Sequence, residues 1–360
     1  MDALITGLYG IPILGLVFQF LGYVLDLLPI LAQTSIVVAV PIALAALCGV
    51  LGERSGVVNI GIEGIMLVGA FVGWIIAAAA ATILGRGTPL LPIFGITWPL
   101  LIGLVAALLA GMLLALLHAW LAISVRVDQI ISGVILNILA LGVTGYLNTL
   151  IAAQSPLEAG KFTALNLPHA ITDLPLVGWI LHAVLDQGPI AIGTIIIVIV
   201  LQILLFRSRW GLRTRAVGEH PKAAETVGID VIRLRYRNVV ASGALAALGG
   251  AYLSMEQTNS FQAGMTNGRG FIGLAAMIVG RWTPIGAFGA AILFAVGTAL
   301  GQAISVGPPN GQLGDLLAKL PAQFFDALPY VVTIIILAGV VGRSIPPAAD
   351  GKPYEREATT

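Results

Sequence analysis

Ten apolar stretches, separated by polar, Gly or Pro residues, are the feature that most limits what this chain can fold into. The hydrocarbon core of a bilayer, about 30 Å thick, is crossed by a helix of about 20 apolar residues. The candidate spans are residues 5–28, 33–52, 58–81, 98–123, 130–152, 189–206, 239–257, 269–280, 285–305 and 323–342. The sequence therefore predicts an all-α polytopic membrane protein with about ten (eight to ten) transmembrane segments, in which 269–280 is a half-helix too short to span.

Composition supports this class. Hydrophobic residues make up 58% of the chain and charged residues 10%, with a mean hydropathy of +1.00, which excludes a soluble domain. The single cysteine, Cys48, lies in an apolar run and excludes a disulfide framework. No GxxxxGK[ST] pattern occurs, so any nucleotide hydrolysis must come from another chain. We expect no nucleic-acid partner.

One long segment, 207–238, interrupts the apolar pattern and is predicted to be a cytoplasmic loop. It carries eight of the 18 Lys and Arg residues: Arg207, Arg209, Arg213, Arg215, Lys222, Arg233, Arg235 and Arg237. Such a positive excess favours the cytoplasmic side of a membrane. Counting spans outward from this loop places both termini in the cytoplasm and leaves only Arg86, Lys161, Arg269 and Lys319 outside.

Within this loop, residues 220–228 have the pattern of a two-turn helix. Pro221 stands in the first turn and Gly228 serves as the stop. A short helix between basic flanks is typical of a docking element, and the arginines can rest on membrane lipid phosphates. The plainer interpretation is a solvated loop that carries positive-inside charge.

The remaining segments give a simple domain organisation. Residues 1–32 form an N-terminal apolar helix, 33–342 a transmembrane domain, and 343–360 a Pro-rich, charged tail that is expected to be disordered. External segments are expected at 82–97, 153–188 and 306–322. The middle one is long enough to hold a short surface helix at 174–185.

Dividing ten spans into five plus five gives two halves of inverted orientation. The Gly-rich segments 52–64 and 268–280 then stand at the third position of each half. Interrupted helices at matching positions of inverted halves indicate a transport pathway. The sequence thus predicts a five-plus-five inverted pseudo-repeat.

Asn59 and Glu63 are the first candidate pathway residues. They are four residues apart, which places them on one face of the predicted 58–81 helix, with Gly61 between them allowing close approach. A carboxylate at membrane depth must be paired with a polar or charged group or be hydrated. Glu63 therefore either lines a polar path or joins helices through a salt bridge or hydrogen bond.

A second polar cluster follows the seventh span. It consists of Glu256, Gln257, Asn259, Gln262, Asn267 and Arg269. These residues line an external vestibule in one interpretation and form an ordinary solvated loop in the other. None of the four histidines has a partner at ligand spacing, and no nucleophile arrangement stands out. We therefore expect no metal site, no cofactor and no enzymatic chemistry.

Three segments in order resemble the permease subunits of bacterial ABC importers for nucleosides and simple sugars, within the wider group of ribose and branched-chain amino acid permeases. They are GERSGVVNIGIEGIML (52–67), RAVGEHPKAAETVGI (215–229) and GRGFIGLAAMIVGRWTPIG (268–286). The resemblance covers roughly residues 33–342. His220 stands where family members often carry Asn.

The resemblance implies a role for segment 219–229 as the coupling helix that seats in an ATP-binding subunit. The residues it assigns to coupling are Glu219, His220, Pro221, Ala223, Ala224, Glu225 and Gly228. It also implies a second permease subunit, an extracytoplasmic solute-binding protein, and a place in the bacterial cytoplasmic membrane. ATP hydrolysis is then expected on a separate subunit.

The leading functional hypothesis is a permease subunit of an ATP-driven importer that forms the path for a nucleoside, lined by Asn59, Gly61, Glu63, Asn267 and Arg269. An alternative cargo is a simple sugar such as ribose or galactose. An alternative of another class is a secondary transporter driven by an ion gradient. It would need intramembrane acids, for which Glu63 and Glu256 are the plausible pair.

Overall fold

The structure is a computed structural model of the chain. It describes residues 12–85, 87, 89–152, 160–168, 178–307, 311–317, 319, 320, 324, 327, 331, 334 and 344–355. The long α-helices are α2 (Pro12–Asp26), α3 (Leu28–Glu53), α4 (Ile62–Leu84), α5 (Trp98–Ala119), α6 (Gln129–Ala152), α9 (Pro189–Arg207), α12 (Val231–Ala251) and α14 (Pro284–Val306). Shorter helices are η1 (Pro92–Phe94), α8 (Gly178–Leu185), α10 (Arg209–Glu219), α11 (Pro221–Thr226), α13 (Arg269–Val279) and α15 (Gln312–Leu317). The π-helical turns η2 (Trp120–Val125) and η3 (Tyr252–Gln257) extend α5 and α12.

Within the described residues, seven helices are long and apolar enough to cross a membrane, among them α5 with η2 and α12 with η3, so the chain is an integral membrane protein. The predicted half-helix at 269–280 is confirmed as α13, which has 11 residues. The expected count of about ten spans is not confirmed, because α2 is short and most of 323–342 lies outside the described residues. The surface helix predicted at 174–185 is present as α8 over Gly178–Leu185. Residues 174–177 lie outside the described part of the chain.

Three predicted helix starts are wrong. The third span begins at Ile62 and not at residue 58, and α12 begins at Val231, eight residues before the predicted start at 239. The second span, α3, begins at Leu28, five residues before the predicted start at 33. Asp230 explains the error at α12, since its carboxylate accepts a hydrogen bond from the Arg233 N–H at 3.0 Å and caps the helix. The predicted 207–238 loop is accordingly mostly helical.

The chain divides into two compact units. The first contains residues up to Val38, 167–186 and 292–340, and the second contains 39–166, 187–291 and the residues from Val341 onward. In the first unit α2 packs against α15, and the Tyr23 hydroxyl donates to the Gly307 carbonyl at 2.7 Å. An apolar groove of about 320 Å³ lies between Leu27, Leu31, Ala299 and Ala303.

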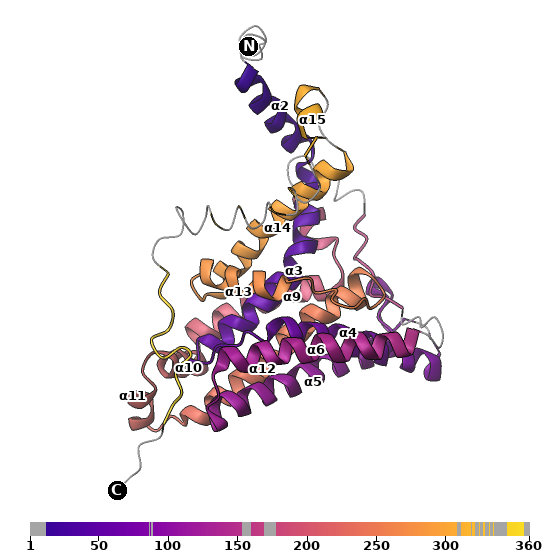
Figure 1. Ribbon diagram of the computed structural model, residues 1–360. Helices are drawn as coiled ribbons and strands as arrows, with labels where there is room; N and C mark the ends of the chain where they lie inside the picture. The colour runs from indigo at the N-terminus through magenta and orange to yellow at the C-terminus, as the bar shows by residue number, and fades with distance from the viewer. Residues whose placement is uncertain are drawn as a thin grey trace. The chain divides into compact units, whose positions relative to one another are not determined.

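The centre of the second unit is the packing of α4, α5 and α12, which run side by side (Figure 1). Glycines permit this close approach. A Cβ on Gly250 of α12 would lie 1.8 Å from the Met66 carbonyl oxygen of α4, and one on Gly111 of α5 would lie 2.6 Å from the Gly243 carbonyl of α12. The apolar stretch of α12 is accordingly 72% buried. Small residues thus bring the backbones into direct contact.

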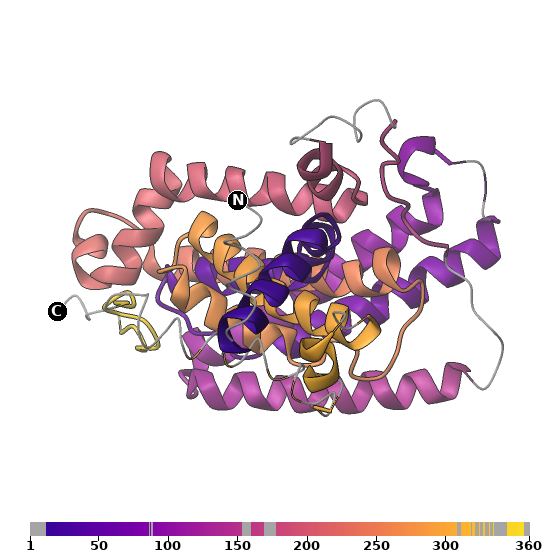
Figure 2. The same ribbon diagram turned by 90° about the horizontal axis from the view of Figure 1, so that it is seen from above.

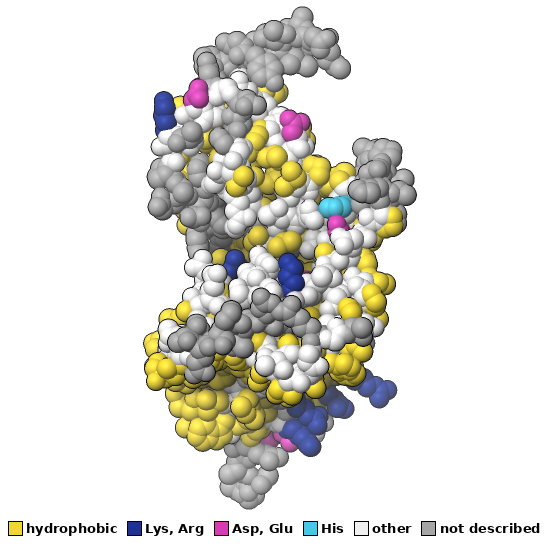
Figure 3. All heavy atoms as spheres, turned by 90° about the vertical axis from the view of Figure 1, so that its right-hand side faces the viewer, with side chains coloured by type: hydrophobic (Ala, Val, Ile, Leu, Met, Phe, Trp, Pro, Cys, Tyr) yellow, Lys and Arg dark blue, Asp and Glu magenta, His cyan; other side chains and the backbone are white. Residues whose placement is uncertain are grey.

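The helices α5, α6 and α9 present large apolar side chains outward. Only 28% of the apolar stretch of each is buried, and exposed residues include Leu109, Leu113, Ile135, Ile138, Ile196 and Ile203. Figure 3 shows a hydrophobic patch at the lower left of the view, with a group of Lys and Arg side chains to its right. Such a surface suits lipid or another membrane helix.

The C-terminal residues 344–355, expected to be part of a disordered tail, are packed instead. The Ala349 N–H donates to the Gly218 carbonyl at 2.9 Å, and Ala349 and Tyr354 are buried. The segment lies beside α10 and α11 in both ribbon views (Figures 1 and 2). Composition predicted disorder because the segment is Pro-rich and charged, but contacts with distant residues order it.

Candidate functional site

The candidate site is built around the loop between α3 and α4, residues 54–61, which carries the first of the three motif segments. The loop leaves α3 in a tight turn in which the Ser55 hydroxyl donates to the Gly52 carbonyl at 2.7 Å. Gly56 has φ +85°, and a Cβ there would lie 2.6 Å from the Arg235 guanidinium. Only glycine meets both demands.

Side chains of α5 and α6 satisfy the backbone of this loop at Val58. The Val58 N–H donates to Gln129 Oε1 at 2.8 Å, and the Val58 carbonyl lies 2.9 Å from His118 Nε2. A carbonyl can only accept, so His118 Nε2 carries the proton, and Nδ1 accepts from the Ser132 hydroxyl at 2.9 Å. Irregular backbone among membrane helices is tolerated where such partners exist.

Asn137 of α6 makes the second set of contacts. Its Nδ2 donates to the Ile60 carbonyl at 2.9 Å, and its Oδ1 accepts from the Gly64 N–H at 2.7 Å. A Cβ on Gly133, one turn earlier, would lie 2.7 Å from the Gly61 nitrogen. The loop is therefore fixed against one face of α6.

Asn59 and Glu63 do not share a helical face, which corrects the sequence prediction. Asn59 lies in the loop, where its Oδ1 accepts from the Gly61 N–H at 2.9 Å, and α4 begins only at Ile62. Asn side chains compete with helical hydrogen bonds in this way. Asn59 and Gly61 are both buried.

Glu63 joins the first motif segment to the third. Its carboxylate accepts from the Gly268 N–H at 2.8 Å and from the Gly270 N–H at 2.7 Å, at the start of α13. Free N–H groups at a helix start favour a carboxylate. Of the two sequence interpretations, the hydrogen bond that joins helices is the one present in the structure.

The other end of α13 contacts the same loop. Arg54 Nε donates to the Trp282 carbonyl at 2.8 Å and Nη2 to the Arg281 carbonyl at 3.1 Å. The Trp282 indole N–H donates to Glu53 Oε2 at 2.5 Å. Arg281 and Trp282 have φ +53° and +52°, a turn that these contacts support. Segment 53–63 thus holds α13 at both ends.

The second motif segment meets this junction through α10. A Cβ on Gly218 would lie 2.3 Å from the Arg54 carbonyl oxygen, so α10 packs directly on the loop backbone. The Phe206 ring lies 5.8 Å from the Arg54 guanidinium and 5.0 Å from that of Arg215. The structure therefore brings all three motif segments together around Arg54.

The short helix predicted within residues 220–228 is present as α11. Pro221 is its first residue, and Gly228 follows with φ +82°, the left-handed conformation that glycine favours. Ala224 is buried, whereas His220 and Ala223 are exposed. Glu219 Oε2 accepts from the Ala348 N–H at 3.1 Å, and Glu225 is hydrogen-bonded to the Tyr354 hydroxyl.

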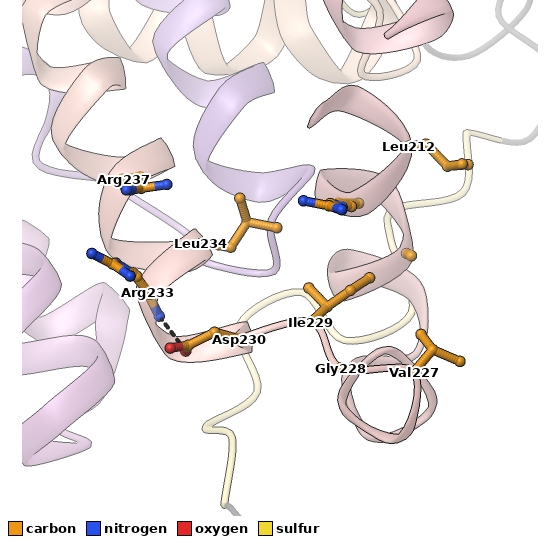
Figure 4. A pocket seen from close by; sticks show the side chains of 10 residues that line it. Leu212, Val227, Gly228, Ile229, Asp230, Arg233, Leu234 and Arg237 are labelled. Atoms are coloured by element: carbon orange, nitrogen blue, oxygen red, sulfur yellow. Dashed lines mark hydrogen bonds between the residues drawn. The ribbon is translucent and has the colours of Figure 1, made fainter. Parts of the chain in front are cut away.

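A groove lies between α10 and the start of α12 (Figure 4). Leu212, Val227 and Leu234 give it an apolar lining, and Arg233 and Arg237 stand on its α12 side. Val227 and Leu212 are 75% and 62% exposed. Basic side chains beside exposed apolar ones suit the membrane surface.

The second polar cluster is divided between several contacts. Asn267 is exposed with φ +44°, and Arg269 Nη1 donates to the Met265 carbonyl at 2.9 Å. Glu256 accepts from the Ile190 N–H at 2.7 Å and from the Ala191 N–H at 3.2 Å, so it caps α9. Among the described residues, no three His, Cys, Asp or Glu side chains gather as metal ligands.

Sequence reasoning missed four residues that hold the loop, namely His118, Gln129, Ser132 and Asn137. Each is a polar residue within or at the end of an apolar helix. Polar side chains at such positions usually face the protein interior and have a partner there. That signal was present, but it does not identify the partner.

Comparison with known proteins identifies the family of the chain. Residues 31–337 match the family model for the permease component of branched-chain amino acid transport systems. The guanosine ABC transporter permease protein NupQ of Bacillus subtilis (strain 168) is 38% identical over 92% of this chain and 98% of its own length. The same strain has a second guanosine permease, NupP, which is 28% identical over 82% of this chain and 80% of its own length.

Two further relatives cover most of the chain. The nucleoside ABC transporter permease protein NupC of Lactococcus lactis subsp. cremoris (strain MG1363) is 35% identical over 92% of this chain and 98% of its own length. The putative glucose ABC transporter permease protein TsgC13 of Haloferax volcanii is 32% identical over 87% of this chain and 92% of its own length. No solved structure matches the chain. The chain therefore belongs to the family of permease components of branched-chain amino acid transport systems.

Proposed function

We propose that this chain is the membrane-spanning permease subunit of an ATP-driven importer and forms the path for a nucleoside. The observation that carries the proposal is the junction around Arg54. There α10, which leads into the exposed helix α11, packs on a loop that holds both ends of α13. Movement of α11 by a partner would reach α13 through rigid contacts.

The path is proposed to pass where Glu63 meets the start of α13. The Glu63 hydrogen bonds bring Asn267 and Arg269 next to the 59–63 segment. Asn59, Gly61, Glu63, Asn267 and Arg269 are the proposed path residues, with Glu63 acting there by fixing α13. An ion-gradient carrier finds less support, because Glu63 and Glu256 are each hydrogen-bonded to helix N-termini.

The proposed partners are an ATP-binding subunit at α11, a second permease subunit, an extracytoplasmic solute-binding protein and membrane lipid. The existence of NupP and NupQ in one bacterium supports a pair of unlike permeases. We place both termini and α10–α11 on the cytoplasmic side of a bacterial inner membrane, because the arginines gather there.

Uptake of labelled guanosine, ribose and glucose by cells with and without this chain tests the proposal. We expect loss of guanosine uptake only, with an ATP-binding subunit co-purifying in mild detergent. Loss of glucose uptake alone would favour the sugar alternative, which the name of TsgC13 raises.

Gly228→Val tests the coupling assignment. No atom lies within 4 Å of a Cβ at Gly228, so the substitution strains only the backbone, by about 1–2 kcal/mol. We expect normal membrane levels with reduced uptake. Gly228→Asn, which tolerates positive φ, is the matched control, and equal uptake by both variants would remove Gly228 from the coupling residues.

A further inference from the structure

Residues 344–355 contact α10, α11 and the 54–61 loop, the parts of the chain through which we propose that α11 acts on α13. We propose that this segment, called here the C-terminal strap, fixes the position of α10 and α11 and is therefore required for coupling. This inference rests on the proposed function only in naming α11 as the coupling helix. That the strap holds α11 can be tested without transport.

The first contact is with the connection between α10 and α11. The Ala349 N–H donates to the Gly218 carbonyl at 2.9 Å, and the Ala348 N–H donates to Glu219 Oε2 at 3.1 Å. The first bond satisfies a carbonyl that the end of α10 leaves open, and the second holds the side chain of Glu219, the last residue of α10. They fix the residues from which α11 starts.

The second contact is with α11. The Tyr354 hydroxyl is hydrogen-bonded to Glu225, and Tyr354 packs with Ala224 and Val217 in one buried cluster. Tyr354 is 7% exposed and Ala224 is 3% exposed. A helix of six residues is not stable by itself, so this packing is what determines its orientation.

The third contact anchors the strap to the membrane helices. Arg235 of α12 is 1% exposed, its Nη1 donates to the Lys352 carbonyl at 3.1 Å, and its guanidinium lies 5.9 Å from the Tyr354 ring. Gly56 has the Ala349 carbonyl 3.0 Å from its Cβ position. The strap thus joins α11 to the loop that holds α13.

The fourth contact is made by Glu355, the last residue of the strap. Arg126, after η2, forms an ion pair with Glu355 at 2.6 Å. Between the strap and α11 lies a groove lined by His220, Pro221 and Ala223 on one side and by Lys352 and Pro353 on the other. The strap therefore shapes the surface around α11 as well as its orientation.

The structural test uses a spin label at Val227→Cys in the purified full chain. Val227 is exposed and the native Cys48 is buried, so the label reacts at one place. Deletion of 345–360 should increase label mobility, whereas deletion of 356–360, which leaves every contact above intact, should not. Equal mobility in the two deletions would overturn the proposal.

The functional test uses the same two deletions and Tyr354→Phe in cells. Loss of several hydrogen bonds should reduce guanosine uptake about tenfold in the longer deletion, with a smaller loss in Tyr354→Phe and unchanged membrane levels. Normal uptake by the longer deletion would overturn the role in coupling. If the full-length chain shows neither uptake nor a co-purifying ATP-binding subunit, the proposed function fails, while the mobility result still decides whether the strap holds α11.

Discussion

The helix core and the α3–α4 loop lie in the same unit but are held together by opposite means. Where α4, α5 and α12 meet, Gly250 and Gly111 have no side chain, so the helix backbones come into direct contact. In the 54–61 loop, particular side chains are present, and His118 and Asn137 bond to a backbone that forms no helix. The first region gains close packing, and the second gains a fixed irregular shape.

This difference predicts how each region responds to substitution. In the core any added atom is harmful, whatever its chemistry, because the space is already filled. In the loop, chemistry decides, since a replacement of equal size without the donor or acceptor leaves backbone groups unpaired. The core is therefore sensitive to volume and the loop to hydrogen bonding.

Gly250→Ala should have the largest effect. Its Cβ would lie 1.8 Å from the Met66 carbonyl, so α4 and α12 must separate at a cost of about 3 kcal/mol or more. We expect little monodisperse protein in detergent and a lower melting temperature. Gly142→Ala in α6, where no atom lies within 4 Å, is the matched control and should be neutral or stabilising. Equal melting temperatures for the two variants would contradict the packing argument.

Asn137→Leu should have the next largest effect. The substitution removes the partner of the Ile60 carbonyl and of the Gly64 N–H, at about 1–3 kcal/mol for each group. Asn137→Asp keeps the acceptor for the Gly64 N–H, so its stability should lie between that of the unchanged protein and that of Asn137→Leu. Thermal unfolding in detergent measures both, and a Leu variant as stable as the unchanged protein would show that the loop does not depend on this side chain.

The same difference explains what the sequence could predict. Apolar length alone was enough to predict helices at the nine stretches before residue 306, and most of the tenth lies outside the described residues. The break after residue 52 was predicted, but its extension through residue 61 was not, because Val57, Val58, Ile60 and Ile62 continue the apolar pattern. Only the local bonds of Asn59 and the distant partners His118 and Asn137 end the helix there.

Local capping signals account for a second group of results. Pro221 and Gly228 predicted α11 correctly because both act through their own backbone. Asp230 gave an equally local signal for the start of α12, but the arginines that follow it suggested a loop. The strap could not be predicted, because its order depends on Gly218 and Arg235, which lie over 100 residues away.

Glu63→Gln tests the hydrogen bonds that join the start of α4 to the start of α13. Glutamine keeps one acceptor oxygen, but it lacks the charge that favours a helix N-terminus and places an NH2 group opposite one of the two N–H donors. We therefore expect a loss of about 1–3 kcal/mol. Guanosine uptake should fall together with the melting temperature. Asp26→Asn, at an exposed carboxylate in α2, is the control for charge alone. Altered uptake with an unchanged melting temperature would make Glu63 a direct solute contact and contradict its role as a cap.

The smallest expected effect concerns the strap and pH. Burial raises the pKa of Asp350 from 3.8 to about 6, although the hydrogen bonds from Glu53 and the Gly351 backbone and the positive charge of Arg235 act in the opposite direction. The packed strap therefore binds the proton more tightly than the released strap does. The contribution of Asp350 to the stability of the strap is fully present below about pH 4 and is lost as the pH rises through about 6.

The spin label at Val227→Cys measures this change. Label mobility should increase modestly between pH 5 and pH 7, because the ionised Asp350 is less favourable in its buried position beside Glu53. Since the two carboxyl groups share a hydrogen bond, the observed transition belongs to the pair. Asp350→Asn keeps the shape and removes the titrating group, so its mobility should be nearly constant over this range. A transition of equal size in Asp350→Asn would assign the pH dependence to another group and leave the strap held by hydrogen bonds that do not titrate.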